Sequence, residues 1–433
     1  MMKISEMPKY EVYKDSGVEW LGDIPASWSL LANKHIFRLK KKQVGKRSSE
    51  YDLLSLTLRG VIKRDMENPE GKFPAEFDTY QEVQCGDFIF CLFDVEETPR
   101  TVGLSPFNGM ITGAYTVFEL NDNFDNRFLY YFYMNLDAKK MLKPLYRGLR
   151  NTIPKDSFLS FKTFVPPHEQ QTRIANFLDK KTALIDEAIS IKEQQISLLK
   201  ERKQIIIQQA VTQGLDPNVP MKDSGVDWIG KIPAHWDIVP GFTVFKEGKD
   251  SNKGMIESQV LSLSYGNVII KPEEKLVGLV PESFETYQIA LPGDIIIRCT
   301  DLQNDKTSLR TGIVRNKGII TSAYLNLRLK TEHSAEFMHY FLHVLDITKT
   351  IYRFGSGLRQ NLSYKDFKHM RILMPPKAEQ IEIVNYINNQ VEVTESSIDL
   401  IKNKIEKLKE YKTTLINSAV TGKIKITPEM VEQ

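Results

Sequence analysis

The sequence has only three cysteines. Cys85, Cys91 and Cys299 form no CxxC motif, so neither a zinc-binding cysteine cluster nor a disulfide framework is indicated. No apolar run reaches the ~18 residues that a membrane-spanning helix needs. The first residues are polar and lack the apolar stretch of a signal peptide. We therefore expect a cytoplasmic protein that makes no membrane contact.

An excess of one charge is also missing. The chain of 433 residues has 58 Lys and Arg against 55 Asp and Glu, a net charge of only +3. A free-standing DNA-binding protein is usually more basic. One cluster is strongly basic and has no acid within it; it consists of Lys34, Arg38, Lys40, Lys41, Lys42, Lys46 and Arg47. It is either a solvated surface or a contact for phosphates, and the composition does not decide between the two.

What the sequence does contain is a long internal repeat. KDSGVEWLGDIPASW at 14–28 returns as KDSGVDWIGKIPAHW at 222–236, an offset of 208. TYQEVQCGDFIF at 79–90 returns at 286–297 with an offset of 207, and ITGAYTVFEL at 111–120 returns at 320–329 with an offset of 209. The protein is therefore one unit used twice, with a period far above that of solenoid repeats.

Each copy begins with short β-rich runs that are separated by turn residues. Gly86-Asp87 precedes the run FIFCLF, and Pro292-Gly293-Asp294 precedes IIIR. A helix is expected to follow in each copy, at 128–142 and at 337–351. These patterns predict two similar α+β domains, at residues 1–165 and 215–374.

Each copy ends in a long helix that a double proline introduces. Pro166-Pro167 and Pro375-Pro376 can each open a helix, and no proline or glycine occurs over 168–213. Apolar residues then recur with heptad spacing: Ile185, Ile189, Ile196, Leu199, Ile206 and Ala210, and in the second copy Ile398, Ile401, Ile405, Leu408, Leu415 and Ala419. Polar residues also fall on this seam, namely Lys192, Lys203, Thr394 and Lys412, so it is imperfect and typical of a partnered helix. We expect helices within 166–214 and 375–433 to pair with each other; two unrelated surface helices are the alternative.

Motifs for catalysis and nucleotide binding are missing. The glycines of Gly225-x4-Gly230-Lys231 resemble a phosphate-binding loop, but Ile232-Pro233 follows where that loop needs Ser or Thr. The double prolines lack the Asp or Asn that precedes them in an amino-methyltransferase motif. No G-x-S-x-G, H-E-x-x-H or dinucleotide-binding fingerprint occurs. These absences argue against an enzyme.

Two further patterns have a functional and a structural interpretation. His339 and His343 lie four residues apart on a predicted helix and could present a metal pair, but such an aromatic-rich stripe is more typical of a core. Tryptophans recur in both opening motifs; they are Trp20, Trp28, Trp228 and Trp236. We expect them to anchor each opening motif to its domain, with stacking on DNA as the alternative.

The doubled motifs resemble the specificity subunits of Type I restriction-modification systems. The resemblance rests on KDSGVEWLGDIPASW, FVPPHEQQTRIANFLD and LLKERKQIIIQQAVTQGL, and on RILMPPKAEQIEIVNYIN and KLKEYKTTLINSAVTGKI in the second copy. It covers nearly the whole chain, and the doubled order is far more specific than any one motif. It implies two target-recognition domains, each reading one half of a split DNA site. Two long antiparallel helices would separate them as a coiled-coil spacer, within a pseudo-two-fold repeat.

The same resemblance implies the partners of the chain. On double-stranded DNA, two methyltransferase (M) subunits and the restriction (R) subunits would join it. S-adenosylmethionine, ATP and magnesium would belong to those partners, and this chain would be non-catalytic and bind no cofactor or metal. Because duplex DNA has the local two-fold symmetry of a unit used twice, we expect half-sites roughly 34 Å apart. A protein-only coiled-coil adaptor and a fused methyltransferase or nuclease are the alternatives.

Residues that differ between the copies are the expected DNA readers, because shared stretches serve as scaffold. The clearest divergence is 91–110 against 298–319, where the second copy is two residues longer. The candidate side chains in the second copy are Gln303, Asn304, Lys306, Arg310 and Arg315. Those in the first copy are Arg100 and Asn108, with Thr98 and Thr101. Arginine favours guanine, and Asn or Gln favours adenine. The other interpretation is an ordinary variable surface loop.

Two smaller features complete the set of DNA-binding candidates. Leu58-Arg59-Gly60 stands opposite Tyr265-Gly266-Asn267, and Lys63 and Arg64 lie just beyond it. A shared Gly-Leu-Arg ends at Arg150 and Arg359, which Asn151 and Gln360 follow. Because this arginine occurs in both copies, it suggests a phosphate contact; the alternative is a structural turn with an arginine that pairs locally.

Overall fold

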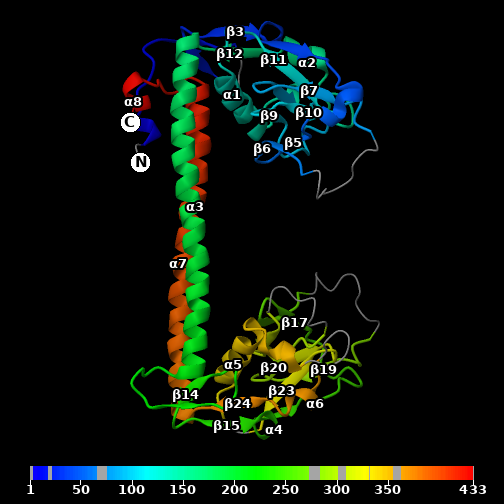
Figure 1. The fold of residues 1–433 in the computed structure, drawn as a ribbon, viewed down its shortest axis with the longest axis vertical. Helices are drawn as coiled ribbons and strands as arrows, with labels where there is room; N and C mark the ends of the chain where they lie inside the picture. The colour runs from blue at the N-terminus through cyan, green and yellow to red at the C-terminus, as the bar shows by residue number, and fades with distance from the viewer. Residues whose placement is uncertain are drawn as a thin grey trace. The chain divides into compact units, whose positions relative to one another are not determined.

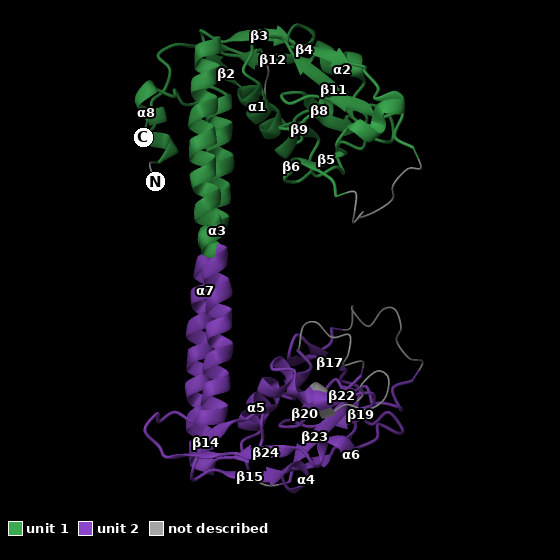
Figure 2. Ribbon diagram, in the orientation of Figure 1, with its two compact units in different colours: residues 1–192, 403–433 green, residues 193–402 purple. Residues whose placement is uncertain are grey.

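A computed structural model describes residues 3–17, 22–65, 76–272, 283–300, 309–330, 332–354 and 362–432. The chain divides into two compact units (Figure 2). Unit 1 consists of residues 1–192 and 403–433, and unit 2 consists of residues 193–402. Each unit therefore contains one α+β domain and a part of each of the two long helices. Among the described residues, no helix is both long and apolar enough to cross a membrane.

The domain of unit 1 is built on a four-stranded antiparallel sheet (Figure 1). Its strand order is β4 (Phe37–Lys40), β11 (Thr116–Leu120), β8 (Phe88–Phe90), β9 (Val102–Leu104). Four two-stranded sheets surround it: β1 (Tyr13–Asp15) with β2 (Asp23–Pro25), β3 (Ser29–Ala32) with β12 (Lys162–Val165), β5 (Leu54–Thr57) with β6 (Gly60–Lys63), and β7 (Gln81–Val83) with β10 (Gly109–Ile111). Helices α1 (Asn126–Ala138) and α2 (Lys155–Ser160) complete the domain.

The domain of unit 2 repeats this plan strand for strand. Its main sheet has the order β16 (Phe245–Glu247), β23 (Leu325–Leu329), β20 (Ile295–Ile297), β21 (Thr311–Ile313). The small sheets are β13 (Met221–Asp223) with β14 (Lys231–Pro233), β15 (Asp237–Pro240) with β24 (Arg371–Met374), β17 (Leu261–Ser264) with β18 (Asn267–Ile270), and β19 (Gln288–Ala290) with β22 (Gly318–Ile320). Its helices are α4 (Gly241–Val244), α5 (Ala335–Ile347) and α6 (Tyr364–Phe367). The sequence repeat is thus a repeat of topology.

The core of each domain lies between the main sheet and one amphipathic helix. Asp125 caps α1 by accepting hydrogen bonds from the backbone N–H groups of Arg127 and Phe128. From there α1 buries Phe128 and Phe132, together with the aromatic rings of the sheet. Ser334 caps α5 in the same way, and this helix buries Phe337 and Phe341. Both helices overlap the predicted ranges, 128–142 and 337–351, but each begins two residues earlier and ends four residues earlier than predicted.

The two long helices are α3 (His168–Gln213) and α7 (Lys377–Val420), and each begins directly after its double proline. The predicted seam is the side that they bury: Ile185, Ile398, Ile405 and Leu415 are all buried. In unit 1, Asp186 pairs with Lys412 at 2.6 Å, and in unit 2, Lys203 pairs with Glu395 at 2.5 Å. The residue later in α3, Lys203, pairs with the residue earlier in α7, Glu395, so the two helices run antiparallel. Two of the lysines on the seam are thus compensated by carboxylates across it.

The opening motif of each domain receives the end of one long helix. Trp28 and Trp236 are fully buried, as the anchoring interpretation predicted, and Trp228 is half-buried, while Trp20 lies outside the described residues. Gly422 follows α7 with a positive φ and lies so close to Pro25 that a Cβ on it would approach within 2.4 Å. The backbone N–H of Lys425 then donates to the carbonyl of Pro8, and α8 (Pro428–Glu432) follows. The end of the chain therefore packs on the domain with which it starts.

Candidate nucleic-acid interface

In unit 1, most of the divergent loop is held by contacts within the domain. Arg150 forms a two-pronged ion pair with Asp94, which raises the pKa of the arginine and lowers that of the carboxylate. Asn151 donates to Glu97 at 3.2 Å. These contacts are those of the structural alternative, a turn whose arginine pairs locally. The equivalent Arg359 and Gln360 lie outside the described residues.

Three other candidates of the divergent loops are tied into their domains. The half-buried Arg100 donates to Tyr130 Oη at 3.2 Å and contacts Met134 Sδ at 2.9 Å. Asn108 Oδ1 accepts from the backbone N–H of Cys85 at 2.8 Å. Arg310 is only 6% exposed, and its guanidinium donates to backbone carbonyls at 3.1 Å and 2.6 Å. The expectation that Arg310 reaches a base edge therefore needs correction, because its charged group is used to hold the loop. Gln303, Asn304 and Lys306 lie outside the described residues.

The basic cluster at 34–47 is largely neutralised by neighbouring carboxylates. Lys40 pairs with Asp87 at 2.8 Å, and Lys42 pairs with Glu82 at 2.8 Å. Arg38 and Arg47 pair with Glu119 and Glu50. These acids are distant in sequence or lie just beyond the cluster, so the run of cations alone could not reveal them. The geometry favours the interpretation as an ordinary surface.

Two large apolar residues that differ between the copies are exposed at the tips of two equivalent hairpins. Leu58 stands between β5 and β6 and is 65% exposed, while Tyr265 stands between β17 and β18 and is 83% exposed. Tyr265 has a φ of +47°, a conformation that is unfavourable for an aromatic residue and is often found at functional positions. Exposing a large apolar side chain at a tip in both domains brings no stability. We therefore interpret the tips as contact points.

Basic residues accompany the tip of unit 1. Arg59 is exposed, and no carboxylate pairs with it among the residues that the structure describes. Lys63 pairs with Asp52 at 2.6 Å and lies 5.4 Å from the ring centroid of Phe107. Arg64 extends the hairpin, since its backbone N–H donates to the carbonyl of Leu53. Of these cations, Arg59 is the one presented most directly to solvent.

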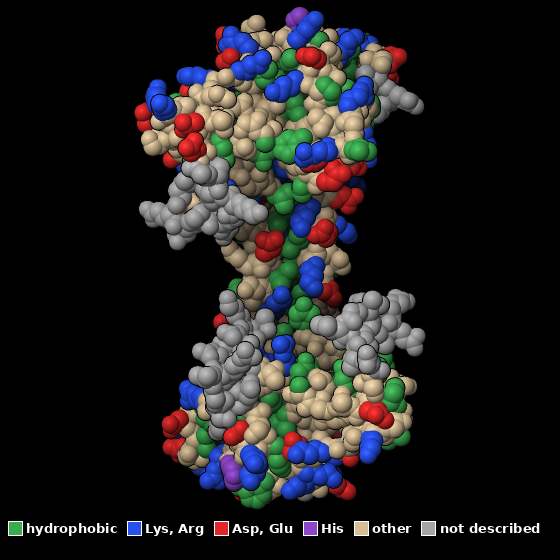
Figure 3. Space-filling model, turned by 90° about the vertical axis from the view of Figure 1, so that its right-hand side faces the viewer, with side chains coloured by type: hydrophobic (Ala, Val, Ile, Leu, Met, Phe, Trp, Pro, Cys, Tyr) green, Lys and Arg blue, Asp and Glu red, His purple; other side chains and the backbone are tan. Residues whose placement is uncertain are grey.

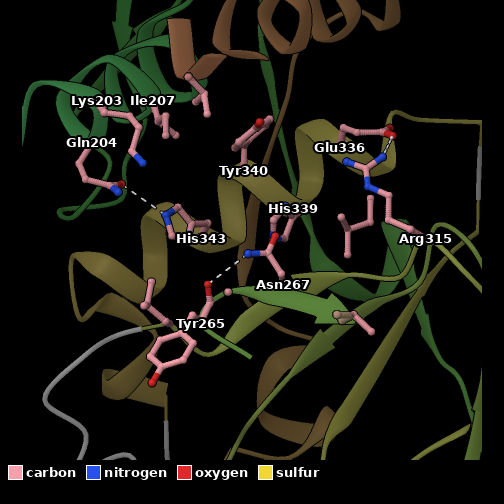
Figure 4. Close-up of a pocket in the computed structure, with 15 residues that line it drawn as sticks. Lys203, Gln204, Ile207, Tyr265, Asn267, Arg315, Glu336, His339, Tyr340 and His343 are labelled. Atoms are coloured by element: carbon pink, nitrogen blue, oxygen red, sulfur yellow. Dashed lines mark hydrogen bonds and ion pairs between the residues drawn. The ribbon is translucent and has the colours of Figure 1, made fainter. Parts of the chain in front are cut away.

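In unit 2 the hairpin tip forms the rim of a pocket of about 280 Å³ (Figure 4). Helix α5 contributes His339, Tyr340 and His343 to its lining. Helix α3 contributes Lys203, Gln204 and Ile207, and the loop after β21 contributes Arg315, which makes a 3.4 Å contact with Glu336. The predicted reader Arg315 therefore lines the same pocket as the hairpin residues Tyr265 and Asn267.

The two histidines of this pocket are neutral at physiological pH. Burial, assisted by His343, lowers the pKa of His339 to about 4, and burial also lowers the pKa of His343. His343 Nε2 lies 3.3 Å from Gln204 Oε1. His339 Nε2 is buried and has no hydrogen-bond partner among the residues that the structure describes.

The metal alternative for this pair finds no support in the described residues. The ring centroids of His339 and His343 lie 6.3 Å apart. No group of three or more His, Cys, Asp or Glu that could hold a metal ion occurs in the described part of the chain. The core interpretation is also incomplete, because the stripe lines a pocket. In the sequence, a helical stripe of aromatic and histidine residues has the same pattern whether it lines a pocket or faces a core.

The corresponding place in unit 1 is filled by different side chains. Tyr130 and Met134 stand in register with His339 and His343, and the side chain of Arg100 lies against both. In unit 2, Leu309 takes the position of Arg100 and lines the pocket. The residues that differ between the copies therefore converge on one location of a shared frame.

A second surface of interest is an exposed apolar stripe on each long helix. On α3 it consists of Leu184, Ile191, Leu198 and Ile205, and on α7 of Tyr386, Val393 and Leu400. The members recur every seven residues, and each directly precedes a position of the buried seam. Figure 3 shows hydrophobic side chains among the lysines and arginines along the helices. The heptad pattern of the sequence predicted only the buried seam; the same seven-residue spacing of Leu184, Ile191, Leu198 and Ile205 is the signal that marks this second row.

The neutral state of His339 predicts an acid-sensitive unit 2. As the pH falls below 6.5 the unfolded chain binds a proton at this residue, but the folded chain does so only near pH 4. Stability is therefore unaffected above this window and lost as the pH falls through it. Replacing His339 with Phe should reduce the loss between about pH 7 and about pH 5 by about 1–2 kcal/mol, as measured by denaturant unfolding. An equal loss in both proteins would contradict the assignment.

Comparison with known proteins identifies this architecture. Residues 102–201 match the family model of the Type I restriction modification DNA specificity domain. A chain from a structural study of complex assembly and conformational transition of the type I R-M system has the same fold. It aligns with a TM-score of 0.66 and 14% identity over 92% of this chain and 98% of its own. The HsdS subunit from Thermoanaerobacter tengcongensis aligns with a TM-score of 0.53 and 15% identity over 93% and 98%.

The repeated α+β domains and the paired helices have the fold of these two solved chains. Within that fold, residues 102–201 match the DNA specificity domain of Type I restriction-modification systems, the family that the doubled motifs resemble.

Proposed function

We propose that this chain selects the DNA sequence on which a Type I restriction-modification complex acts, with one domain reading each half of a split target. The observation that carries the proposal is the convergence of divergent residues on a repeated frame. Units 1 and 2 share their strand order, yet they differ at the hairpin tip and the helix face beside it. A constant scaffold with a variable contact surface is what two readers of different half-sites require.

The proposed contacts follow from the chemistry of the exposed side chains. Arg59 is placed to form the two-pronged hydrogen bond that arginine makes with guanine, and Asn267 can pair with adenine. The apolar Leu58 and the ring of Tyr265 suit a thymine methyl group or a base face. Arg315 joins the reading surface of unit 2, whereas the locally paired Arg150 and Asn151 serve mainly to shape unit 1.

The exposed stripes suggest where partner subunits bind. In unit 2, Leu198 and Ile205 on α3 lie on the side of the helix pair that also carries Leu400 and Val393 of α7, because each of the four precedes a seam residue in an antiparallel pair. Large apolar residues in a regular row on a helix are typical of a covered surface. We assign this surface to helices of two methyltransferase subunits, to which the restriction subunits add.

In this proposal the chain itself has no catalytic role. S-adenosylmethionine, ATP and magnesium belong to the methyltransferase and restriction subunits, and the complex works in the cytoplasm, where its double-stranded DNA lies. The small net charge of +3 fits a subunit whose partners supply part of the positive surface around DNA. A protein-only adaptor would have no use for divergent residues that converge in this way.

Methylation mapping tests the proposal directly. The chain is co-produced with its methyltransferase subunit in a host that lacks the system, and the modified bases of the genome are mapped. We expect a split motif with one modified base on each strand, which is lost when this chain is omitted. Methylation that does not depend on this chain, or that shows no sequence preference, would refute the function as a DNA reader.

A further inference from the structure

We infer that Arg100 reads a guanine in the half-site of unit 1, and that the hydroxyl of Tyr130 holds its guanidinium in the reading position. The inference rests on the proposed function and adds to it one base and the residue that selects it. In the sequence, Arg100 is one of several candidates; the structure shows which part of its side chain is available. The side chain is half-buried, and its Nη1 atom donates to Tyr130 Oη at 3.2 Å and contacts Met134 Sδ at 2.9 Å.

The other two nitrogens of this guanidinium form an open edge. Nε and Nη2 carry two parallel N–H donors, the geometry that binds a pair of acceptors. Arg47 directs this edge at Glu50, and both of its donors are used. In Arg100 no described residue accepts from either atom, and neither is among the described polar atoms that are buried without a partner. The edge is therefore accessible to a ligand.

The acids of the same loop do not neutralise Arg100. Asp94, Glu96 and Glu97 lie shortly before it in the sequence, but each pairs with another part of the domain. A half-buried cation without a counter-ion costs stability. An arginine that the fold keeps apart from these carboxylates is thus available to acceptors from outside the chain.

Arg100 lies beside the exposed hairpin tip of unit 1. Strand β9 begins two residues after it and contacts both β6 of the hairpin and α1, which carries Tyr130 (Figure 1). A Cβ on Gly60, which directly follows the tip, would lie 3.9 Å from Tyr130 Oη. The guanidinium is therefore held next to the tip residues that the proposed function places on DNA.

The open edge and the difference between the copies together select guanine. In the major groove only guanine presents two neighbouring acceptors, O6 and N7, whereas adenine and cytosine present an amine donor as well. Two phosphate oxygens could also meet this edge, but every half-site has phosphates, so that contact would be useful in both units. Unit 2 instead has Leu309 at this position. A residue needed in one half-site only is expected to read a base.

The test uses the complex with its methyltransferase and target DNA in which each guanine is replaced in turn by 7-deazaguanine, which lacks the N7 acceptor. We expect the wild-type complex to lose about 10-fold in affinity at one guanine, in the half-site that Tyr265→Ala leaves unchanged. Arg100→Leu should bind guanine and 7-deazaguanine equally well there. Tyr130→Phe should show an intermediate preference, because it removes only the hydroxyl that holds Nη1. Arg47→Leu is the matched control and should keep the full preference, since the edge of Arg47 is already filled.

The outcomes separate the inference from the proposed function. An Arg100→Leu complex that is as sensitive as wild type at every guanine overturns the inference and leaves the proposed function intact. Equal weakening on all DNA, with no change in base preference, would assign the guanidinium to phosphate and also overturns it. If Arg100→Leu fails to assemble, Arg100→Met, which is unbranched and uncharged, gives the same comparison. Tolerance of 7-deazaguanine throughout that half-site by the wild type overturns the inference without any variant, and a wild-type complex with no split target would instead refute the proposed function.

Discussion

Replacing Leu400 with Asp is expected to prevent assembly with the methyltransferase and thereby to abolish methylation by the complex. Leu400 is 57% exposed in the free chain, so the substitution leaves the buried seam intact and the chain should fold. In the proposed complex the carboxylate would be buried without a partner, a change that typically costs about 3–5 kcal/mol, or more than ~100-fold in affinity. Co-purification of the two subunits and mapping of modified bases measure the effect.

The matched control for this variant is Asn403→Asp. It introduces the same charge three residues further along α7, at an exposed position outside the apolar stripe. We expect this variant to assemble and to methylate as the wild type does. If Leu400→Asp also assembles normally, the stripe is not the docking surface, and if both variants fail, the helix pair has been disturbed in a general way.

Substitution of the hairpin tips is expected to change the recognised sequence one half at a time. Tyr265→Ala should relax the preference at one or two base pairs of one half-site by roughly 10- to 100-fold, because each specific contact is worth about 1–3 kcal/mol. Arg59→Ala should relax the other half-site to a similar extent. Methylation mapping of each variant shows which half of the motif has become degenerate.

These two variants control each other, since each should leave the half-site of the other unchanged. A variant that weakens binding to all DNA without altering the motif would assign its residue to the phosphate backbone. If both variants altered the same half-site, the assignment of one domain to each half would be wrong.

The divergent loops show which features of the structure the sequence did not predict. The extra two residues of the second copy lie before Arg310, because the backbone N–H of Arg310 donates to Asp346 just as that of Thr101 donates to Asp137. Divergence correctly marked these loops as variable. It could not show that the charged group of Arg310 points inward, since a buried guanidinium and an exposed one have the same sequence signature.

The histidine pair was likewise predicted only in part: the sequence indicated its helix face but not what that face contacts. Helical spacing placed His339 and His343 on one face of α5, which the structure confirms. Whether that face meets a core, a metal or a cavity depends on what stands opposite it. Here the opposite side is formed by the β17–β18 hairpin and by α3, whose residues are far away in the sequence.

The sequence by itself determined the duplication, the α+β character of each copy, the two long helices and the seam along which they pair. These features depend on local patterns, namely periodicity, proline and glycine positions and repeated motifs, which can be recognised in the sequence alone. Only the tertiary structure decided which polar groups are free to meet a ligand. That outcome depends on partners that the fold brings in from distant parts of the chain, such as Asp94 for Arg150 and the backbone carbonyls that hold Arg310.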